Sequence, residues 1–210
     1  MFHDRIEAGI ILAKKLKKYI GKEGVVLAVP RGGVPVAYAV AKELNMPVDI
    51  VLTKKIGHPL NKEYAIGVAS LTDYFVNPEE SVSDTYIHSE LRKIRQRLQE
   101  MHARFMGNKE PENISGKLAI VIDDGIATGN TLLGTVHVLR KSNPKKIIVA
   151  APVASGTAVN MLSKEVDEVV VALVPDEFYG VGAFYEDFEQ VSDEEVMFYL
   201  DKLSTLRKAG

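Results

Sequence analysis

The feature that most constrains this chain is the stretch of residues 119–131, which reads AIVIDDGIATGNT. Ala119–Ile122 is a short apolar run without polar alternation, which is typical of a strand buried on both faces of a parallel sheet. Gly125 and Gly129 allow sharp turns, and an apolar pattern with helical spacing begins at Thr131. The stretch therefore predicts a strand, a short polar loop at its carboxyl end, and a helix. Open α/β sheets bind their ligands at such a loop.

The loop combines two kinds of polar group. Its second part, Thr128–Thr131, gathers free backbone N–H groups, two hydroxyls and the positive end of a helix dipole, which together favour a phosphate. Asp123 and Asp124 would repel a phosphate, and instead suit a vicinal diol or a magnesium-bearing group on the same ligand. A sugar phosphate satisfies both parts of the loop.

Other phosphate-binding motifs fit this loop less well. In a Walker loop four residues separate the two glycines and a lysine follows the second, whereas three residues separate Gly125 from Gly129 and Asn130 follows. A G-x-G-x-x-G dinucleotide fingerprint is absent from the sequence. The stretch resembles instead the ribose-phosphate loop of the type I phosphoribosyltransferases, which has an apolar strand, an acidic pair, A/T-T-G and a terminal Ser or Thr.

This resemblance implies roles for the loop residues. Asp123 and Asp124 would hold the ribose hydroxyls of phosphoribosyl pyrophosphate. The 5′-phosphate of the same molecule would lie on a cup formed by Ala127, Thr128, Gly129, Asn130 and Thr131. The alternative is a surface acidic turn before an ordinary helix.

A second strand-loop-helix unit occurs earlier in the chain, where the apolar run Val25–Val29 is followed by residues 30–35 (PRGGVP). Arg31 supplies positive charge, and Gly32 and Gly33 would let an anion approach backbone N–H groups. The unit resembles the pyrophosphate loop of the same family. Relatives often have a non-proline cis peptide in that loop, and we place one at or next to Arg31. A plain tight turn is the alternative.

The next predicted strand, Asp49–Thr53, is followed by a Gly/Pro/Asn-rich segment that predicts a mobile loop with a cationic root. The family has a flexible lid here that closes over the pyrophosphate, and the resemblance makes three residues candidates for it: Lys54, Lys55 and His58. The hairpin arms of the lid are expected at Ile66–Ser70 and Tyr74–Val76. For His58 the alternative is an exposed loop histidine without a role in binding.

Residues 83–106 give the longest helix pattern in the sequence. Its apolar positions step alternately by four and three, which predicts a narrow seam: Ile87, Leu91, Ile94, Leu98, Met101 and Phe105. The seam could pack on the core of its own chain, cover the lid, or meet a second subunit in a homodimer. Small family members lack such a helix, so we regard it as an insertion.

The fold class follows from the alternation of strands and helices. Ile147–Val153 and Val169–Val174 predict the fourth and fifth strands. Five apolar strands alternating with helices predict an α/β fold with a five-stranded parallel sheet and flanking helices. We expect a single domain over residues 1–210, with its core at about 24–174. The lid and inserted helix span about 54–106, and a C-terminal hood and helix span about 175–208.

The hood segment, residues 175–188, carries five aromatic residues. It resembles the loop over the base in hypoxanthine-guanine phosphoribosyltransferases, which implies that Phe178 stacks on the acceptor base. The alternative is a group of aromatics that plugs the end of the sheet. Two departures from those relatives argue against a 6-oxopurine acceptor and leave the acceptor unnamed. Ala127 stands where many purine-salvage relatives carry a catalytic Asp, and Glu177 stands where the hypoxanthine-guanine group has a Lys.

Composition narrows the class of protein. The 210 residues carry a formal net charge of −2, so nothing indicates nucleic acid or an anionic membrane as a partner. The absence of cysteine excludes disulfides and thiol catalysis. No apolar run is as long as a membrane span. These features lead us to expect a cytoplasmic protein.

The sequence therefore predicts transfer of a 5-phosphoribosyl group from phosphoribosyl pyrophosphate to a nitrogenous base, with release of pyrophosphate. Arg31, Lys54 and Lys55 would stabilise the leaving anion together with Mg²⁺, which would arrive largely on the donor and not in a cage made by protein alone. Two rival hypotheses remain. One is a non-catalytic regulatory protein that senses phosphoribosyl pyrophosphate, and the other is a phosphohydrolase, for which the sequence shows no obvious nucleophile or metal cluster.

Overall fold

Five parallel strands form the central sheet of the computed structural model, which describes the backbone of residues 1–208 and the side chains up to Ser204. In the order β2-β1-β6-β7-β8 they are Val48–Ile50, Gly24–Ala28, Leu118–Ile122, Lys146–Val153 and Glu168–Leu173. This confirms the predicted five-stranded parallel sheet. Because β6 is central, its carboxyl end lies beside the ends of both β1 and β7.

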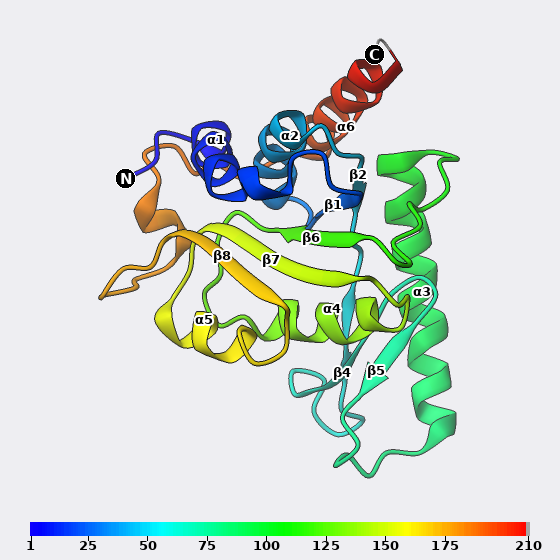
Figure 1. The fold of residues 1–210 in the computed structure, drawn as a ribbon. Coiled ribbons are helices and arrows are strands. Elements are labelled where there is room, and N and C mark those ends of the chain that lie inside the picture. Colours follow the sequence, from blue (N-terminus) through cyan, green and yellow to red (C-terminus); the bar gives the residue numbers. More distant parts are fainter. Residues whose placement is uncertain (209–210) are drawn as a thin grey trace.

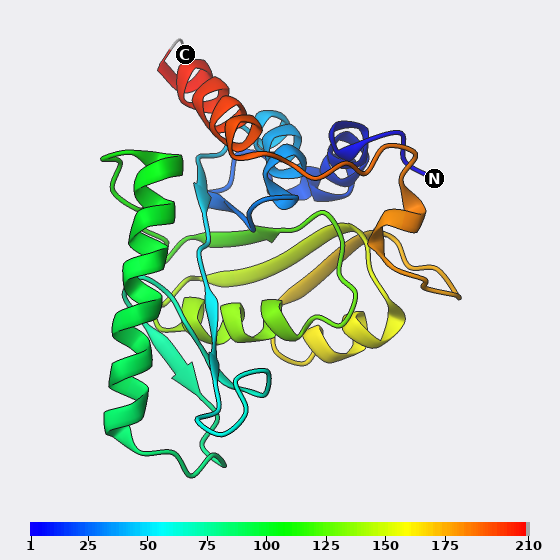
Figure 2. The ribbon, with the colours of Figure 1, turned by 180° about the vertical axis from the view of Figure 1, so that it is seen from behind.

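Helices cover both faces of this sheet (Figures 1 and 2). One face carries α1 (Arg5–Leu16, continued by the short turn η1, Lys17–Tyr19), α2 (Gly33–Leu44) and α6 (Asp193–Lys208), and the other carries α4 (Asn130–Arg140) and α5 (Gly156–Leu162). Residues of β6 alternate between the two cores: Ile120 and Ile122 face α1 and α2, whereas Ala119 and Val121 face α4 and α5. All four are fully buried, which explains why the strand sequence is apolar without alternation.

The segment after β2 forms a second, antiparallel sheet of three strands: β3 (Lys54–Gly57), β4 (Ala65–Ala69) and β5 (Tyr74–Val76). Strands β4 and β5 confirm the two predicted hairpin arms. The prediction that Lys54 and Lys55 begin a loop is wrong, because both pair with β4 as part of β3. The predicted strand 49–53 is also shorter, since β2 ends at Ile50, opposite the last residue of β1.

This lid sheet is docked on α4. A β-carbon on Gly134 of α4 would lie 2.2 Å from a methyl group of Val68 in β4. Phe75 of β5 stacks on His137 of α4, with ring centroids 4.3 Å apart. The absence of a side chain at Gly134 therefore lets the lid sheet approach the helix closely.

The inserted helix α3 (Asp84–Met106) runs beside the lid sheet towards α6 (Figure 1). Five of the predicted seam residues are buried in the same core as lid and α6 residues: Ile87, Leu91, Ile94, Leu98 and Phe105. Of the three interpretations, packing within the chain is confirmed. The assignment of Met101 to this seam is wrong, because its side chain is 37% exposed and borders a hollow shared with Arg31.

The N-terminal segment lies beside the hood, residues 175–188, at one end of the sheet (Figure 1). Phe2 N donates to Phe184 O at 2.8 Å, and Glu186 N donates to Phe2 O at 2.9 Å. The hood includes one 3-10 turn, η2 (Val181–Phe184). The start of the chain and the hood therefore form one unit. Within residues 1–208, no helix combines the length and apolarity that a membrane crossing requires.

Candidate active site

Two adjacent carboxylates, Asp123 and Asp124, follow the carboxyl end of β6. The backbone N–H of Asp124 donates to Asp123 Oδ1 at 2.9 Å, which fixes the first side chain against the loop. Burial raises the pKa of Asp123 well above its ordinary value, and the neighbouring Asp124 carboxylate raises it further. Such a pair accepts hydrogen bonds from hydroxyl groups and has no means of binding a bare anion.

The loop that contains Arg31, Gly32 and Gly33 touches this acid pair. A β-carbon on Gly32 would lie 2.0 Å from Asp124 Oδ2, and one on Gly33 would lie 2.6 Å from the carbonyl oxygen of Ile122. The two glycines therefore let the loop pack against the end of β6. The Pro30–Arg31 peptide is cis, as predicted.

The backbone amides of the two glycines differ. Gly33 N donates to Val29 O at 3.0 Å, which occupies it. Gly32 N has no acceptor in the described part of the chain. The sequence predicts these glycines only as a path for an anion to the backbone. The structure adds contact between two loops as a second reason for them.

The two loops border one hollow of about 560 Å³. Its walls include three predicted site residues, Arg31, Gly32 and Asp124. The other residues that line it are Arg5, Pro30, Met101, Phe188, Gln190 and Val191. The predicted pyrophosphate loop and Asp124 of the acid pair thus meet around one space, whereas Asp123 and Gly33 do not line it.

The predicted phosphate cup begins three residues after Asp124 and leads into α4. Gly129 has a φ of 76°, a left-handed conformation that favours glycine. Ala127, Thr128, Asn130 and Thr131 are exposed. Among the described residues, none accepts a hydrogen bond from the backbone amides of 127–131. The cup therefore presents unused donors at the positive end of a helix.

Arg31 is engaged by a carboxylate of α6. Its Nε lies 2.7 Å from Asp193 Oδ1, and Arg104 Nη1 of α3 lies 2.5 Å from Asp193 Oδ2. The hydrogen bond from Arg104 and the charge of Arg31 hold the pKa of Asp193 below its ordinary value. Asp193 is therefore a carboxylate shared by two guanidinium groups.

Sequence reasoning missed Arg5, which reaches the acid pair from the other end of the chain. Arg5 Nε donates to Asp124 Oδ2 at 2.9 Å, and the two side chains are only 12% and 15% exposed. The guanidinium also donates to Glu189 O at 2.8 Å and lies 4.0 Å from the centre of the Phe188 ring. In the sequence Arg5 is only the start of a helix, and no motif connects it to a residue 119 positions away.

Tyr185 is a second missed neighbour of the acid pair. Its hydroxyl donates to the carbonyl oxygen of Asp124 at 2.6 Å. The hood therefore contacts Asp124 in two ways. Tyr185 binds its backbone carbonyl directly, and Phe188 packs on Arg5, which binds its side chain.

The lid candidates do not line the hollow. Lys54 is exposed, and Lys55 Nζ pairs with Glu63 Oε2 at 2.8 Å. His58 Nδ1 accepts a hydrogen bond from Leu60 N at 3.2 Å, which shapes the lid loop. The structure places these three residues on the lid sheet and its loop, away from the walls that carry Arg31 and Asp124.

Phe178 is also absent from the walls of the hollow. It stacks on Phe184 with ring centroids 5.6 Å apart and joins the small core of the hood. This placement agrees with the alternative in which the aromatics plug the end of the sheet. The aromatic residue that faces the hollow is Phe188.

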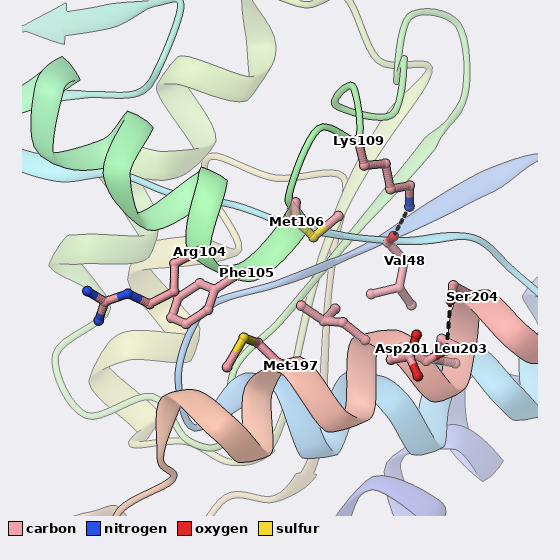
Figure 3. A pocket seen from close by; sticks show the side chains of 10 residues that line it. Val48, Arg104, Phe105, Met106, Lys109, Met197, Asp201, Leu203 and Ser204 are labelled. Atoms are coloured by element: carbon pink, nitrogen blue, oxygen red, sulfur yellow. Dashed lines mark hydrogen bonds between the residues drawn. The ribbon is translucent and has the colours of Figure 1, made fainter.

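A larger hollow, of about 710 Å³, lies between α3 and α6 (Figure 3). It is lined mainly by apolar side chains such as Phe105, Met106, Met197 and Leu203, and it contains none of the predicted site residues. Among the residues that the structure describes, no three His, Cys, Asp or Glu side chains cluster as a metal site. The carboxylates that the candidate site offers to a ligand are therefore those of the acid pair, Asp123 and Asp124.

Comparison with known proteins shows which family this chain resembles. The family model of the phosphoribosyl transferase domain matches residues 3–188. A Mycobacterium tuberculosis protein, whose own assignment as a phosphoribosyl transferase is provisional, is 36% identical over 207 residues. The match covers 96% of this chain and 47% of the relative. The chain therefore spans about half the length of these curated relatives.

Two solved structures show the same fold. The protein TT1426 from Thermus thermophilus has a TM-score of 0.88 and 36% identity, with 97% of this chain and 99% of that chain covered. The AQ2163 protein from Aquifex aeolicus has a TM-score of 0.51 and 16% identity over 93% of this chain and 85% of that one. The first similarity extends through α3 and the hood, because it covers nearly the whole of both chains.

Proposed function

Because this chain belongs to the phosphoribosyl transferase family, we propose that it moves a 5-phosphoribosyl group from phosphoribosyl pyrophosphate to a nitrogenous base and releases pyrophosphate. The observation that carries the proposal is the contact between Gly32 and Asp124 at a hollow that Arg31 also lines. The carboxylate to which we assign the ribose diol and the guanidinium to which we assign the pyrophosphate line the same hollow. The cup at the start of α4 supplies a second anion site on the same strand end.

In this proposal the sugar is held by the end of β6. Asp123 and Asp124 accept hydrogen bonds from the ribose hydroxyls, and the amides of 127–131 bind the 5′-phosphate. These contacts fix C1 of the ribose relative to Arg31, whose charge stabilises the departing pyrophosphate.

The reaction itself is a substitution at C1. The bond from C1 to the pyrophosphate oxygen breaks and its electron pair leaves with pyrophosphate, while a nitrogen of the base supplies the pair for the new bond to C1. The base releases its N–H proton to solvent. Positive charge develops on the ribose, as in glycoside cleavage. The two carboxylates lie on the ribose side of the site and stabilise that charge.

The donor set at the site suits Mg²⁺. Carboxylate oxygens are the ligands that this ion prefers, and Asp124 provides them in the hollow that Arg31 also lines, with Asp123 adjacent to it in the chain. A magnesium ion carried by the donor would neutralise charge on the pyrophosphate. Everything else in the scheme is done by side chains and amides of the protein.

The lid residues contribute to the proposed reaction only if the lid sheet moves. Lys54, Lys55 and His58 lie outside the hollow while the lid sheet is docked on α4. Closure of the sheet over the bound donor would bring cationic side chains to the pyrophosphate and exclude water.

Turnover distinguishes the proposal from its rivals. Pyrophosphate release is measured with phosphoribosyl pyrophosphate and Mg²⁺ across a panel of bases, nucleosides and amines. The proposal predicts release with one class of base, lost in Asp124→Asn and kept in Asp176→Asn, an exposed hood carboxylate. Donor binding without turnover across the panel would support the regulatory sensor. Release with water alone would support a phosphohydrolase.

A further inference from the structure

Asp193 is the only carboxylate that the described salt bridges place between two arginines. Arg31 belongs to the loop after β1, and Arg104 belongs to the inserted helix α3. Their guanidinium nitrogens lie 2.7 Å and 2.5 Å from the two oxygens of the same carboxylate. Two cations from distant parts of the sequence therefore converge on one anionic group.

The position of α3 makes this convergence relevant to the candidate site. Met101 lines the same hollow as Arg31, Gly32 and Asp124. Arg104 follows three residues later, so it lies on the same side of the helix as Met101. Arg104 itself lines the larger hollow between α3 and α6, and Figure 3 shows its guanidinium extending away from Met106 and Leu203. The insertion thus places a cation beside the loop that carries Arg31.

We propose that Arg104 binds the pyrophosphate end of the donor together with Arg31, and that Asp193 occupies this anion position when no ligand is bound. The inference rests on the proposed function, because it assumes a donor that carries pyrophosphate. It assigns a binding role to the inserted helix, whose function the sequence pattern left open.

The chemistry of the three groups supports this exchange. Guanidinium groups bind phosphate oxygens as well as carboxylate oxygens, in the same forked geometry. The side chains of Arg31 and Arg104 are 41% and 63% exposed, so a ligand can reach them. Asp193 brings one negative charge, whereas pyrophosphate brings several, so the ligand attracts both arginines more strongly than the carboxylate does.

A purely structural role is the competing explanation. In that case Arg31, Asp193 and Arg104 only tie α3 and α6 to the loop after β1. Loss of either Arg104 or Asp193 would then lower stability. Anion affinity would stay unchanged in both variants or fall in both. The proposal instead requires opposite effects of the two substitutions on anion affinity.

The test is calorimetric titration with magnesium pyrophosphate and, separately, with the whole donor. The variants are Arg104→Gln, Arg104→Lys and Asp193→Asn, with thermal unfolding measured for each. Arg92→Gln is the matched control, because Arg92 is exposed on α3 and lies roughly two and a half turns before Met101, on the opposite side of the helix. Arg104→Lys keeps the charge and should recover part of the affinity.

We expect Arg104→Gln to weaken pyrophosphate binding by about tenfold, the usual effect of losing one charge-assisted hydrogen bond. We expect Asp193→Asn to strengthen it by about threefold or more, since a competing charge is removed. Arg92→Gln should match the wild type. An unchanged affinity in Arg104→Gln, or a weakened one in Asp193→Asn, overturns the proposal. Wild-type protein that binds the donor but not pyrophosphate overturns this inference alone, and binding of neither ligand overturns the proposed function as well.

Discussion

Gly32 lies so close to Asp124 that a β-carbon on the glycine would stand 2.0 Å from the carboxylate oxygen Oδ2. Real β-carbons do not approach other atoms this closely, so any side chain at position 32 must displace the loop or the carboxylate. The same contact joins Asp124, which the proposal assigns to the ribose, to the loop of Arg31, which it assigns to the pyrophosphate. Local packing and ligand binding therefore depend on the same glycine.

Replacement of Gly32 by Ala should separate the two loops. We expect the free energy of unfolding to fall by about 1–3 kcal/mol, the usual cost of overpacking, and donor binding to weaken. Urea unfolding and calorimetry measure the two effects. Gly156→Ala is the control, because a β-carbon there would meet nothing within 4 Å. Equal behaviour of the two variants would show that the loops do not depend on this contact.

The ion pair between Arg5 and Asp124 predicts energetic coupling between the N-terminus and the acid pair. Both side chains are nearly buried, so removal of one partner leaves an unpaired charge. A double-mutant cycle of Arg5→Met and Asp124→Asn should give a coupling energy of about 1–3 kcal/mol in urea unfolding.

The control for this cycle is His3→Ala, which removes the exposed contact between His3 and Glu186 at the same end of the chain. Its effect should add to that of Asp124→Asn within about 0.5 kcal/mol. If the coupling energy between Arg5 and Asp124 is also below about 0.5 kcal/mol, the ion pair does not form in solution.

Asp123 predicts a pH dependence of stability. Its pKa in the folded state is raised above the ordinary value of 3.8, chiefly by burial. Its contribution to stability is therefore fully present below the unfolded pKa and is lost as the pH rises through the folded pKa. Asp123→Asn should then stabilise the protein against urea more at pH 8 than at pH 5. A difference between variant and wild type that stays constant with pH would contradict the shift.

The same carboxylate predicts a pH dependence of donor binding. Ribose hydroxyls that donate to Asp123 favour its charged form, so donor affinity should rise with pH as this group ionises. The Asn variant, titrated with the same donor, should lose this part of the dependence, and ionisation of the ligand cancels in the comparison. Parallel pH profiles for the two proteins would argue against contact between Asp123 and the ribose.

The lid sheet gives a prediction about packing. A β-carbon on Gly134 would lie 2.2 Å from Val68, so Gly134→Ala should push β4 away from α4. We expect a loss of about 1–3 kcal/mol in the free energy of unfolding. The double variant Gly134→Ala with Val68→Ala should recover part of it, because the smaller residue makes room. A double variant no more stable than the additive sum would show that these residues do not touch.

The core of the fold could be predicted from the sequence because β1, β2, β6 and β7 are buried on both faces. Uninterrupted apolar runs such as Ala119–Ile122 give an unambiguous pattern, and the helices between them dictate a parallel sheet. The two loops after β1 and β6 were also predictable, since Gly32, Gly33 and Gly129 mark backbone that side chains would disturb.

The remainder depends on contacts between distant residues. Arg5 meets Asp124 across 119 positions, and Arg104 meets Asp193 across 89, and neither contact leaves a periodic pattern in the sequence. Met101 has the spacing of a buried residue but faces a hollow. Lys54 and Lys55 directly precede a Gly/Pro/Asn-rich stretch, which favours a loop, yet pairing with β4 makes them part of a strand. Tertiary contacts overrode the local signal in each case.

The central claim is that one sugar phosphate is held at once by the cup, the acid pair and the loop of Arg31. A crystal structure of the protein with phosphoribosyl pyrophosphate and Mg²⁺ tests this most directly. We predict the 5′-phosphate at the amides of 127–131, the ribose hydroxyls at Asp123 and Asp124, and the pyrophosphate at Arg31. Donor bound elsewhere, or with its phosphates away from both loops, would contradict the account.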